Sequence, residues 1–110
     1  MLIADFMRAM ENKDYVALSK CFSDECFLMD HCPSGAGKEN YHIYGSKAIE
    51  MFYHNKFILG GLQAMDPVIQ SERTVNYFCS YGGVIIHVQA TIELYDQTTG
   101  LIKEMIIRPA

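Results

Sequence analysis

Apolar side chains recur every three or four positions at the start of the chain, which is the spacing of an amphipathic helix. The positions that carry this pattern are Leu2, Ile3, Phe6, Met7 and Met10. Asp14 then has the right side chain to cap a second helix, because its carboxylate can accept from the first free N–H groups. We expect this second helix to continue through Phe22 and to end near Ser23.

A strand, a loop and a third helix are expected next. The apolar run Cys26 to Met29 is typical of a buried strand, and it ends at the carboxylate of Asp30. A Pro-Ser-Gly-Ala-Gly stretch follows, so we expect a loop that continues to about Gly45. Ser46 can begin a third helix, which Gly60-Gly61 would end.

The second half of the chain has the composition and patterning of β-strands. The expected strands cover residues 62–70, 73–81, 84–95 and 101–108. Gly82-Gly83 is a hairpin signal between the second and third of them. Pro67 lies inside the first, which therefore is an edge strand or carries a bulge. Helices followed by an antiparallel meander predict an α+β fold, and the length predicts one domain over residues 1–110.

The strand over residues 84–95 has two faces that both carry large side chains. One face is aliphatic and consists of Val84, Ile86, Val88, Ala90, Ile92 and Leu94. The other is mixed and consists of Ile85, His87, Gln89, Thr91, Glu93 and Tyr95. Either the mixed face is plain solvent surface, or it lines a cavity while the aliphatic face packs on another subunit. The second alternative requires a strongly curved sheet.

Composition limits the classes of partner. The net charge is −4 and the basic residues are scattered singly, so we expect no nucleic-acid partner. No apolar run approaches the roughly 18 residues that cross a bilayer, and the N-terminus lacks the pattern of a signal peptide. We therefore expect no membrane partner and a cytoplasmic location. The four cysteines have no CxxC spacing and are expected to be reduced and buried.

The order of these elements resembles the nuclear transport factor 2-like superfamily, and within it the SnoaL-like polyketide cyclase and ketosteroid isomerase-related group. The resemblance covers essentially the whole chain. It rests on FSDE before the strand that ends in Asp30, on G-x-x-x-I-x-x-F-Y from Gly45 to Tyr53, and on the closing LYDQTTGLIKEMIIRP hairpin. It implies a cone-shaped curved antiparallel sheet wrapped around three N-terminal helices, a deep apolar pocket, and a homodimer through the outer sheet face.

The resemblance also implies roles for individual residues. Asp30 matches the aspartate base of ketosteroid isomerase, and Tyr53 matches a supporting tyrosine of its hydrogen-bond network. The two oxyanion donors are absent, because their positions hold Phe6 and Thr91. Losing one such donor typically costs about 2.7 to 4 kcal/mol of transition-state stabilisation. Steroid isomerisation by the same route is therefore not expected.

Asp30 is also the leading catalytic candidate on physical grounds. A carboxylate at the edge of an apolar pocket has a raised pKa, because burial disfavours its charged form, and it can then exchange a proton near neutral pH. The plain alternative is that Asp30 only caps the turn at residues 31–33. If Asp30 is a base, His87 and Tyr53 are candidates to hold a developing enolate oxygen. Each also has an ordinary alternative, as a structural histidine and a core tyrosine.

Further side chains are expected to line the pocket. These candidate ligand-binding residues are Phe6, Met10, Phe57, Gln89, Thr91, Met105 and Ile107. The apolar members could equally be core packing. Asp30, His31, Cys32 and His42 are of types that bind zinc, but their spacing matches no zinc motif, so we expect neither a metal nor another cofactor.

The leading interpretation is a SnoaL-like protein that binds a small apolar molecule bearing a carbonyl group, with isomerase-type or cyclase-type proton transfer by Asp30. The alternative is a noncatalytic dimerising or ligand-sensing module of the same fold. An enzyme requires an open cavity of roughly a few hundred Å³ that reaches Asp30. In a structural module the same space is filled by Phe6, Tyr53, Phe57 and Met105.

Overall fold

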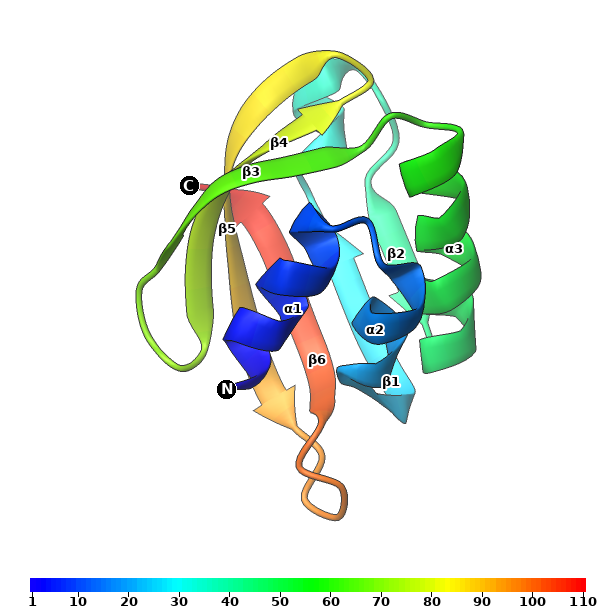
Figure 1. Ribbon diagram of the computed structural model, residues 1–110, viewed down its shortest axis with the longest axis vertical. Helices are drawn as coiled ribbons and strands as arrows, with labels where there is room; N and C mark the ends of the chain where they lie inside the picture. Colours follow the sequence, from blue (N-terminus) through cyan, green and yellow to red (C-terminus); the bar gives the residue numbers. More distant parts are fainter.

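Three helices cover one face of a single curved sheet (Figure 1). The computed structural model describes residues 1–110. The helices are α1 (Leu2–Glu11), α2 (Tyr15–Lys20) and α3 (Ser46–Ile58), and a short 3-10 turn, η1, spans Pro33–Ala36. The strands are β1 (Phe22–Asp30), β2 (Tyr41–Tyr44), β3 (Gln63–Ile69), β4 (Thr74–Tyr81), β5 (Val84–Tyr95) and β6 (Ile102–Pro109). The predicted α+β class is confirmed.

The six strands lie in the order β2-β1-β6-β5-β4-β3. β1 pairs with β6 in parallel, and every other neighbouring pair is antiparallel. The last four strands form the predicted meander. β3 is an edge strand, and its pairing with β4 shifts register between Met65 and Val68, on either side of Pro67. Both the edge position and the irregularity expected at this proline are confirmed.

Two boundaries in the first half differ from the sequence prediction. The second helix ends at Lys20, because Phe22 already belongs to β1 and lies opposite Ile102 of β6. The expected loop before Gly45 contains β2, which pairs with β1. The prediction missed this strand because it is only four residues long and lies in a glycine-rich stretch.

Of the two alternatives for β5, the one in which the mixed face lines the cavity is wrong, and the one in which this face is the outer surface fits the structure. Val88, Ala90 and Ile92 are completely buried beneath the helices, whereas His87 and Gln89 are exposed and Thr91 is half-buried on the outer face of the sheet. The physical reason is that the helices lie on this side of the sheet. Burying the uniformly aliphatic face beneath them removes the most apolar surface from water. Gln89 and Thr91 therefore do not line the cone, and the buried Val88, Ala90 and Ile92 are not a subunit contact.

The space between helices and sheet is filled by a single apolar core. Five of the predicted pocket residues belong to it and are at most 3% exposed: Phe6, Met10, Phe57, Met105 and Ile107. All four cysteines are buried and free, as predicted. No helix combines the length and the apolar character that crossing a bilayer would require.

Candidate functional site

Asp30 lies at the end of β1, between Tyr41 of β2 and Ile107 of β6 in the sheet. It is only 2% exposed. Its Oδ2 accepts a 2.6 Å hydrogen bond from the hydroxyl of Tyr81, and its Oδ1 accepts a 2.9 Å bond from the backbone N–H of Cys32. The second bond is the turn cap that the sequence suggested. The first is a separate interaction, which joins the end of β1 to the end of β4 across the interior.

The pKa of Asp30 is raised above its ordinary value, and burial is the main cause. A carboxylate that has lost its hydration is harder to ionise. The hydrogen bonds from Tyr81 and Cys32 favour the charged form and offset part of this rise. The predicted upward direction is confirmed, and it brings the carboxyl closer to the pH range in which a general base operates.

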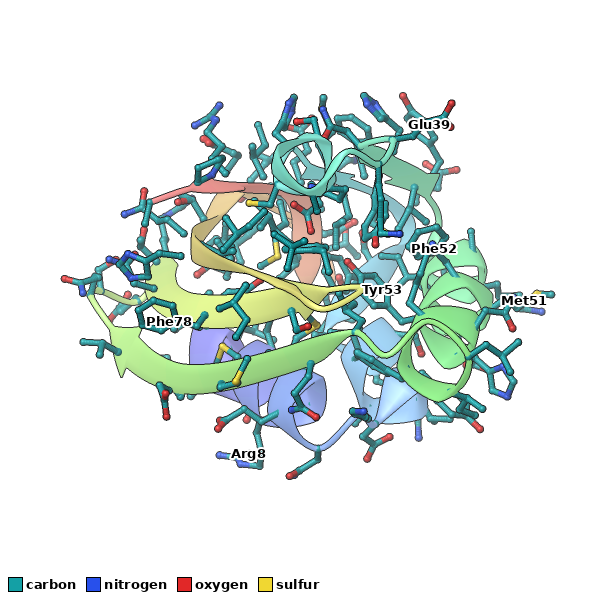
Figure 2. The ribbon with its side chains drawn as sticks, turned by 90° about the horizontal axis from the view of Figure 1, so that it is seen from above. Arg8, Glu39, Met51, Phe52, Tyr53 and Phe78 are labelled. Atoms are coloured by element: carbon teal, nitrogen blue, oxygen red, sulfur yellow. The ribbon has the colours of Figure 1, made fainter.

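Two more tyrosine hydroxyls lie in the interior, and neither has a hydrogen-bond partner. Tyr53 comes from α3 and Tyr77 from β4, and both are completely buried. Burial raises both pKa values well above 10, and the charge of the nearby Asp30 raises them further. Figure 2 shows Tyr53 in the middle of the molecule, between α3 and the sheet. An unpaired buried hydroxyl typically costs about 1 to 3 kcal/mol, so these two groups need an explanation.

Cys32 and Cys79 are completely buried near the same carboxyl. Burial raises the pKa of Cys79 to about 12 and that of Cys32 well above its ordinary value, and the Asp30 charge raises both further. The nucleophilic form of cysteine is the thiolate, which these values exclude at neutral pH. The two sulfurs are therefore part of the apolar surroundings of Asp30.

His87 does not lie near Asp30, so its predicted role as a partner of that base is wrong. Its ring is on the outer face, stacked on Phe78 with centroids 4.5 Å apart. Gln89, on the same face, donates a 3.1 Å hydrogen bond to Asn76. Of the predicted catalytic residues, only Asp30 and Tyr53 lie together in the interior.

Sequence reasoning missed Tyr77 and Tyr81. A signal was present, because β4 alternates Val75, Tyr77, Cys79 and Tyr81 on one face, and all four are at most 1% exposed. Tyr81 directly precedes the Gly82-Gly83 turn, which placed it at one end of the sheet. The pattern predicts the strand, but it does not show what the hydroxyl groups of its buried tyrosines contact.

The mouth of the cone is closed by aromatic rings. A hollow of about 530 Å³ lies between α3 and the segment before β2, and its lining includes Lys38, Tyr41, Phe52 and Lys56; we call it the mouth hollow. The rings of Tyr41 and Phe52 pack edge to face with their centroids 4.7 Å apart, and the centroids of the Tyr41 and Tyr81 rings are 6.2 Å apart. Asp30 lines none of the five main hollows.

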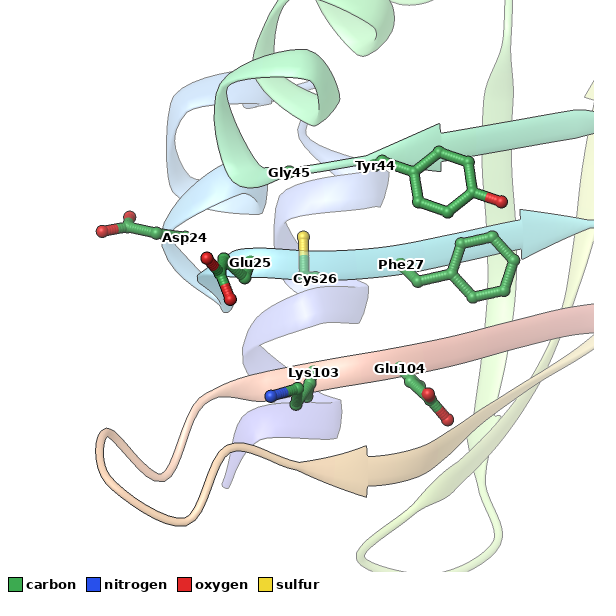
Figure 3. A pocket seen from close by; sticks show the side chains of 8 residues that line it. All are labelled: Asp24, Glu25, Cys26, Phe27, Tyr44, Gly45, Lys103 and Glu104. Atoms are coloured by element: carbon green, nitrogen blue, oxygen red, sulfur yellow. The ribbon is translucent and has the colours of Figure 1, made fainter.

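A second hollow, of about 410 Å³, lies between β1, β2 and β6 (Figure 3). The rings of Phe27 and Tyr44 stack beside it with centroids 4.7 Å apart, and Tyr44 is 68% exposed. Asp30 faces the interior and is not part of it. No three His, Cys, Asp or Glu side chains are grouped closely enough to hold a metal ion.

Solved structures share this architecture over nearly the whole chain. A nuclear transport factor 2-like protein of unknown function from Cytophaga hutchinsonii matches with a TM-score of 0.66 at 14% identity, over 99% of this chain and 87% of that chain. The chain has the nuclear transport factor 2-like fold. The fold predicted from the sequence is thus confirmed.

Two other solved structures that this chain resembles carry names that suggest chemistry. One is a proposed polyketide cyclase from Sinorhizobium meliloti, with a TM-score of 0.68 and 16% identity over 96% of this chain and 92% of that chain. The other is a proposed isomerase from Bacillus subtilis, with a TM-score of 0.65 and 18% identity over 97% and 82%. No family model matches the sequence, and no curated protein matches it. These identities support the fold alone, so function has to be argued from the site.

Proposed function

We propose that the interior of the cone binds a small, largely apolar molecule with a carbonyl group, and that Asp30 moves a proton at the carbon next to that carbonyl. The observation that carries this proposal is the pair of unpaired hydroxyls on Tyr53 and Tyr77 beside the Asp30 carboxyl. Each hydroxyl is a donor without an acceptor in an apolar interior. A carbonyl oxygen is an acceptor that an otherwise apolar molecule can bring there.

The proposed chemistry follows from what each group can do. The ionised carboxylate of Asp30 takes the proton, the electron pair of the broken C–H bond forms a C=C bond to the carbonyl carbon, and the π pair of the C=O bond moves to the oxygen. Hydrogen bonds from Tyr53 and Tyr77 stabilise the negative charge that develops on this oxygen. Return of the proton to a different carbon is an isomerisation. In a cyclisation the enolate carbon instead attacks a second carbonyl of the same molecule, the π pair of that carbonyl moves to its oxygen, and this oxygen takes the proton back from Asp30. Tyr81 acts as a positioning residue that holds the carboxylate.

Entry of a ligand requires the rings of Tyr41 and Phe52 to separate. Both rings line the mouth hollow, and Phe52 is half-buried. The ring of Tyr41 also lies near Tyr81, one of the residues that we call the Asp30 cluster: Asp30, Tyr53, Tyr77 and Tyr81. Side-chain rotations of this kind occur without unfolding of the surrounding elements. The proposal therefore needs a local opening at the end of β2 and α3, together with movement of the core side chains that now fill the interior, and no change of fold.

A noncatalytic module is the second candidate, and two observations favour it: none of the five main hollows reaches Asp30, and core side chains occupy the interior. Phe6, Tyr53, Phe57 and Met105 are each at most 3% exposed and fill the cone. In this case the bond between Tyr81 and Asp30 serves only to fasten β4 to β1.

A matched pair of probes separates these two candidates. 2-Acetylnaphthalene has a carbonyl group, and 2-ethylnaphthalene has nearly the same shape without it. We expect the ketone to bind about tenfold more tightly, the equivalent of one well-formed buried hydrogen bond. Fluorescence titration of the wild type measures both dissociation constants.

The double variant Tyr53→Phe/Tyr77→Phe should remove the preference for the ketone, whereas Tyr44→Phe on the outer face should keep it. Equal binding of the two probes by the wild type would contradict the proposed role of the hydroxyls. Binding of neither probe would favour the filled, noncatalytic module.

We also propose that two copies associate through the outer sheet face. Three large apolar side chains support this: Tyr44, Phe78 and Ile85 are 68%, 39% and 60% exposed. Phe78 and Ile85 lie on the outer face of the β4–β5 hairpin, and Tyr44 lies at the β2 edge. Exposed apolar groups that share one face commonly mark an interface.

Thr91→Arg should separate such a dimer without unfolding the chain. Thr91 is on the outer face, between Thr74 of β4 and Ile106 of β6, so an arginine there would meet the partner and not the core. Sedimentation equilibrium should give half the wild-type mass. Met51→Arg is the control, because Met51 is 70% exposed on the outer side of α3 (Figure 2). A monomeric wild type, or a variant that stays dimeric, would rule out this interface.

A further inference from the structure

The mouth hollow combines aromatic rings with two lysines, and Lys56 is the more constrained of the two. It is half-buried near the end of α3, with its Nζ 5.1 Å from the ring centre of Tyr41 and 5.3 Å from that of Phe52. Cation–π contacts of this kind fix the position of an ammonium but do not neutralise it. The ion pairs of the structure all involve other residues, so Lys56 has no carboxylate within 4.0 Å.

Lys38 reaches the mouth hollow from the segment that follows η1. Its amine lies against the turn between β4 and β5, because a Cβ placed on Gly82 would come within 3.1 Å of Nζ. Lys38 also lacks a carboxylate partner. The one acid of the hollow is Glu39, which is exposed, as is Lys38. With two lysines against one carboxylate, the hollow has an excess of one positive charge in a chain whose net charge is −4.

One residue, Tyr41, borders both the mouth hollow and the Asp30 cluster. Tyr41 lines the hollow and is also the direct neighbour of Asp30 across the β1–β2 pair. Directly opposed residues in an antiparallel pair have their side chains on the same face, about 5 Å apart at Cβ. Tyr81, which donates to Asp30, directly precedes the Gly82 turn on which Lys38 lies. An elongated molecule with its carbonyl at the cluster would thus have its other end among the lysines.

We propose that the mouth hollow is an anion site, and that the ligand of the cone is a carbonyl compound with a carboxylate at its far end. Lys38 and Lys56 bind the carboxylate, the rings of Tyr41 and Phe52 flank the apolar middle of the molecule, and the carbonyl lies at Tyr53 and Tyr77. This inference rests on the proposed function for the position of the carbonyl. The anion site itself rests only on the two lysines and the hollow.

The test compares 6-acetyl-2-naphthoic acid with its methyl ester, which has the same ketone and ring system but no charge. The acid should bind about tenfold more tightly than the ester at low salt, the worth of one charge-assisted contact. Sodium chloride at about 0.5 M should remove most of this advantage by screening. Isothermal titration calorimetry gives both dissociation constants directly.

The double variant Lys38→Gln/Lys56→Gln should bind acid and ester equally. Lys20→Gln/Lys47→Gln, at two exposed lysines outside the mouth hollow, is the control and should keep the preference. If the ester binds but the acid has no advantage, or if the advantage survives in Lys38→Gln/Lys56→Gln, the anion site is wrong and the proposed function stands.

A third set of variants separates the two proposals in the other direction. If binding of the acid needs the lysines but is unchanged in Tyr53→Phe/Tyr77→Phe, the anion site is correct and the proposed position of the carbonyl is wrong. Binding of neither probe would overturn both proposals.

Discussion

Asp30→Asn is expected to slow deuterium exchange at the methyl group of 2-acetylnaphthalene by about 100-fold or more, the usual contribution of a general base. Asparagine keeps the shape of the side chain but cannot accept the proton. The methyl carbon is next to the carbonyl, so its exchange in heavy water reports proton removal without a known substrate. Proton NMR of the probe measures the rate.

The matched control is Asp66→Asn, an exposed aspartate on β3 whose positive backbone φ of 52° asparagine also tolerates. This control should exchange the probe at the wild-type rate. A fully active Asp30→Asn would remove Asp30 from the mechanism. If the wild-type protein binds the ketone but does not catalyse its deuterium exchange, the protein is a binding module and not an enzyme.

The same substitution should change how stability depends on pH. The folded pKa of Asp30 is raised, so between about 4 and that pKa the folded protein holds a proton that the unfolded chain has lost. The free energy of unfolding contributed by Asp30 is therefore greatest below pH 4, falls as the pH rises through the folded pKa, and is constant above it. Urea unfolding of wild type and Asp30→Asn at a series of pH values gives the difference in their free energies of unfolding, and the change of this difference with pH is the contribution of Asp30. At pH 7 the variant should be at least as stable as the wild type.

Val88→Glu is expected to cost about 4 kcal/mol or more, a large part of the roughly 5 to 15 kcal/mol by which a domain of this kind is stable at 25 °C. Val88 is completely buried in the middle of β5, on the face that the helices cover. A carboxylate there has no partner and must either lose its hydration or stay protonated at a free-energy cost. Circular dichroism and urea titration measure the loss.

The neighbouring substitution Gln89→Glu introduces the same side chain on the exposed face of the same strand. It should change the free energy of unfolding by no more than about 0.5 kcal/mol. A folded Val88→Glu together with an unfolded Gln89→Glu would mean that β5 faces the other way and that the core is misassigned.

The sequence predicted the helices and the meander because their signals are local. The apolar residues of α1 repeat within a few positions of one another. The hairpin signal is equally local, because Gly82 and Gly83 both have positive φ. The faces of β5 were harder, because alternation separates two faces without saying which one the helices cover. The uniformly aliphatic face is the one that forms the core. The expectation that polar side chains line the cone favoured the opposite orientation.

The site was predictable only in part for the same reason. The carboxylate at the end of β1 is visible in the sequence as one acid after an apolar run, and its raised pKa follows from burial. Tyr81 meets it from 51 residues away, through the packing of two strands that are not neighbours in the sheet. The closure of the mouth by Tyr41 depends on β2, the strand that the sequence did not reveal.

A crystal structure of the protein soaked with 2-acetylnaphthalene tests the central claim most directly, because it locates the carbonyl itself. We predict the naphthalene ring inside the cone, the rings of Tyr41 and Phe52 moved apart, and the carbonyl oxygen within hydrogen-bond distance of the hydroxyl of Tyr53 or Tyr77. A ketone bound only on the outer surface, above an interior whose side chains have not moved, would contradict the account.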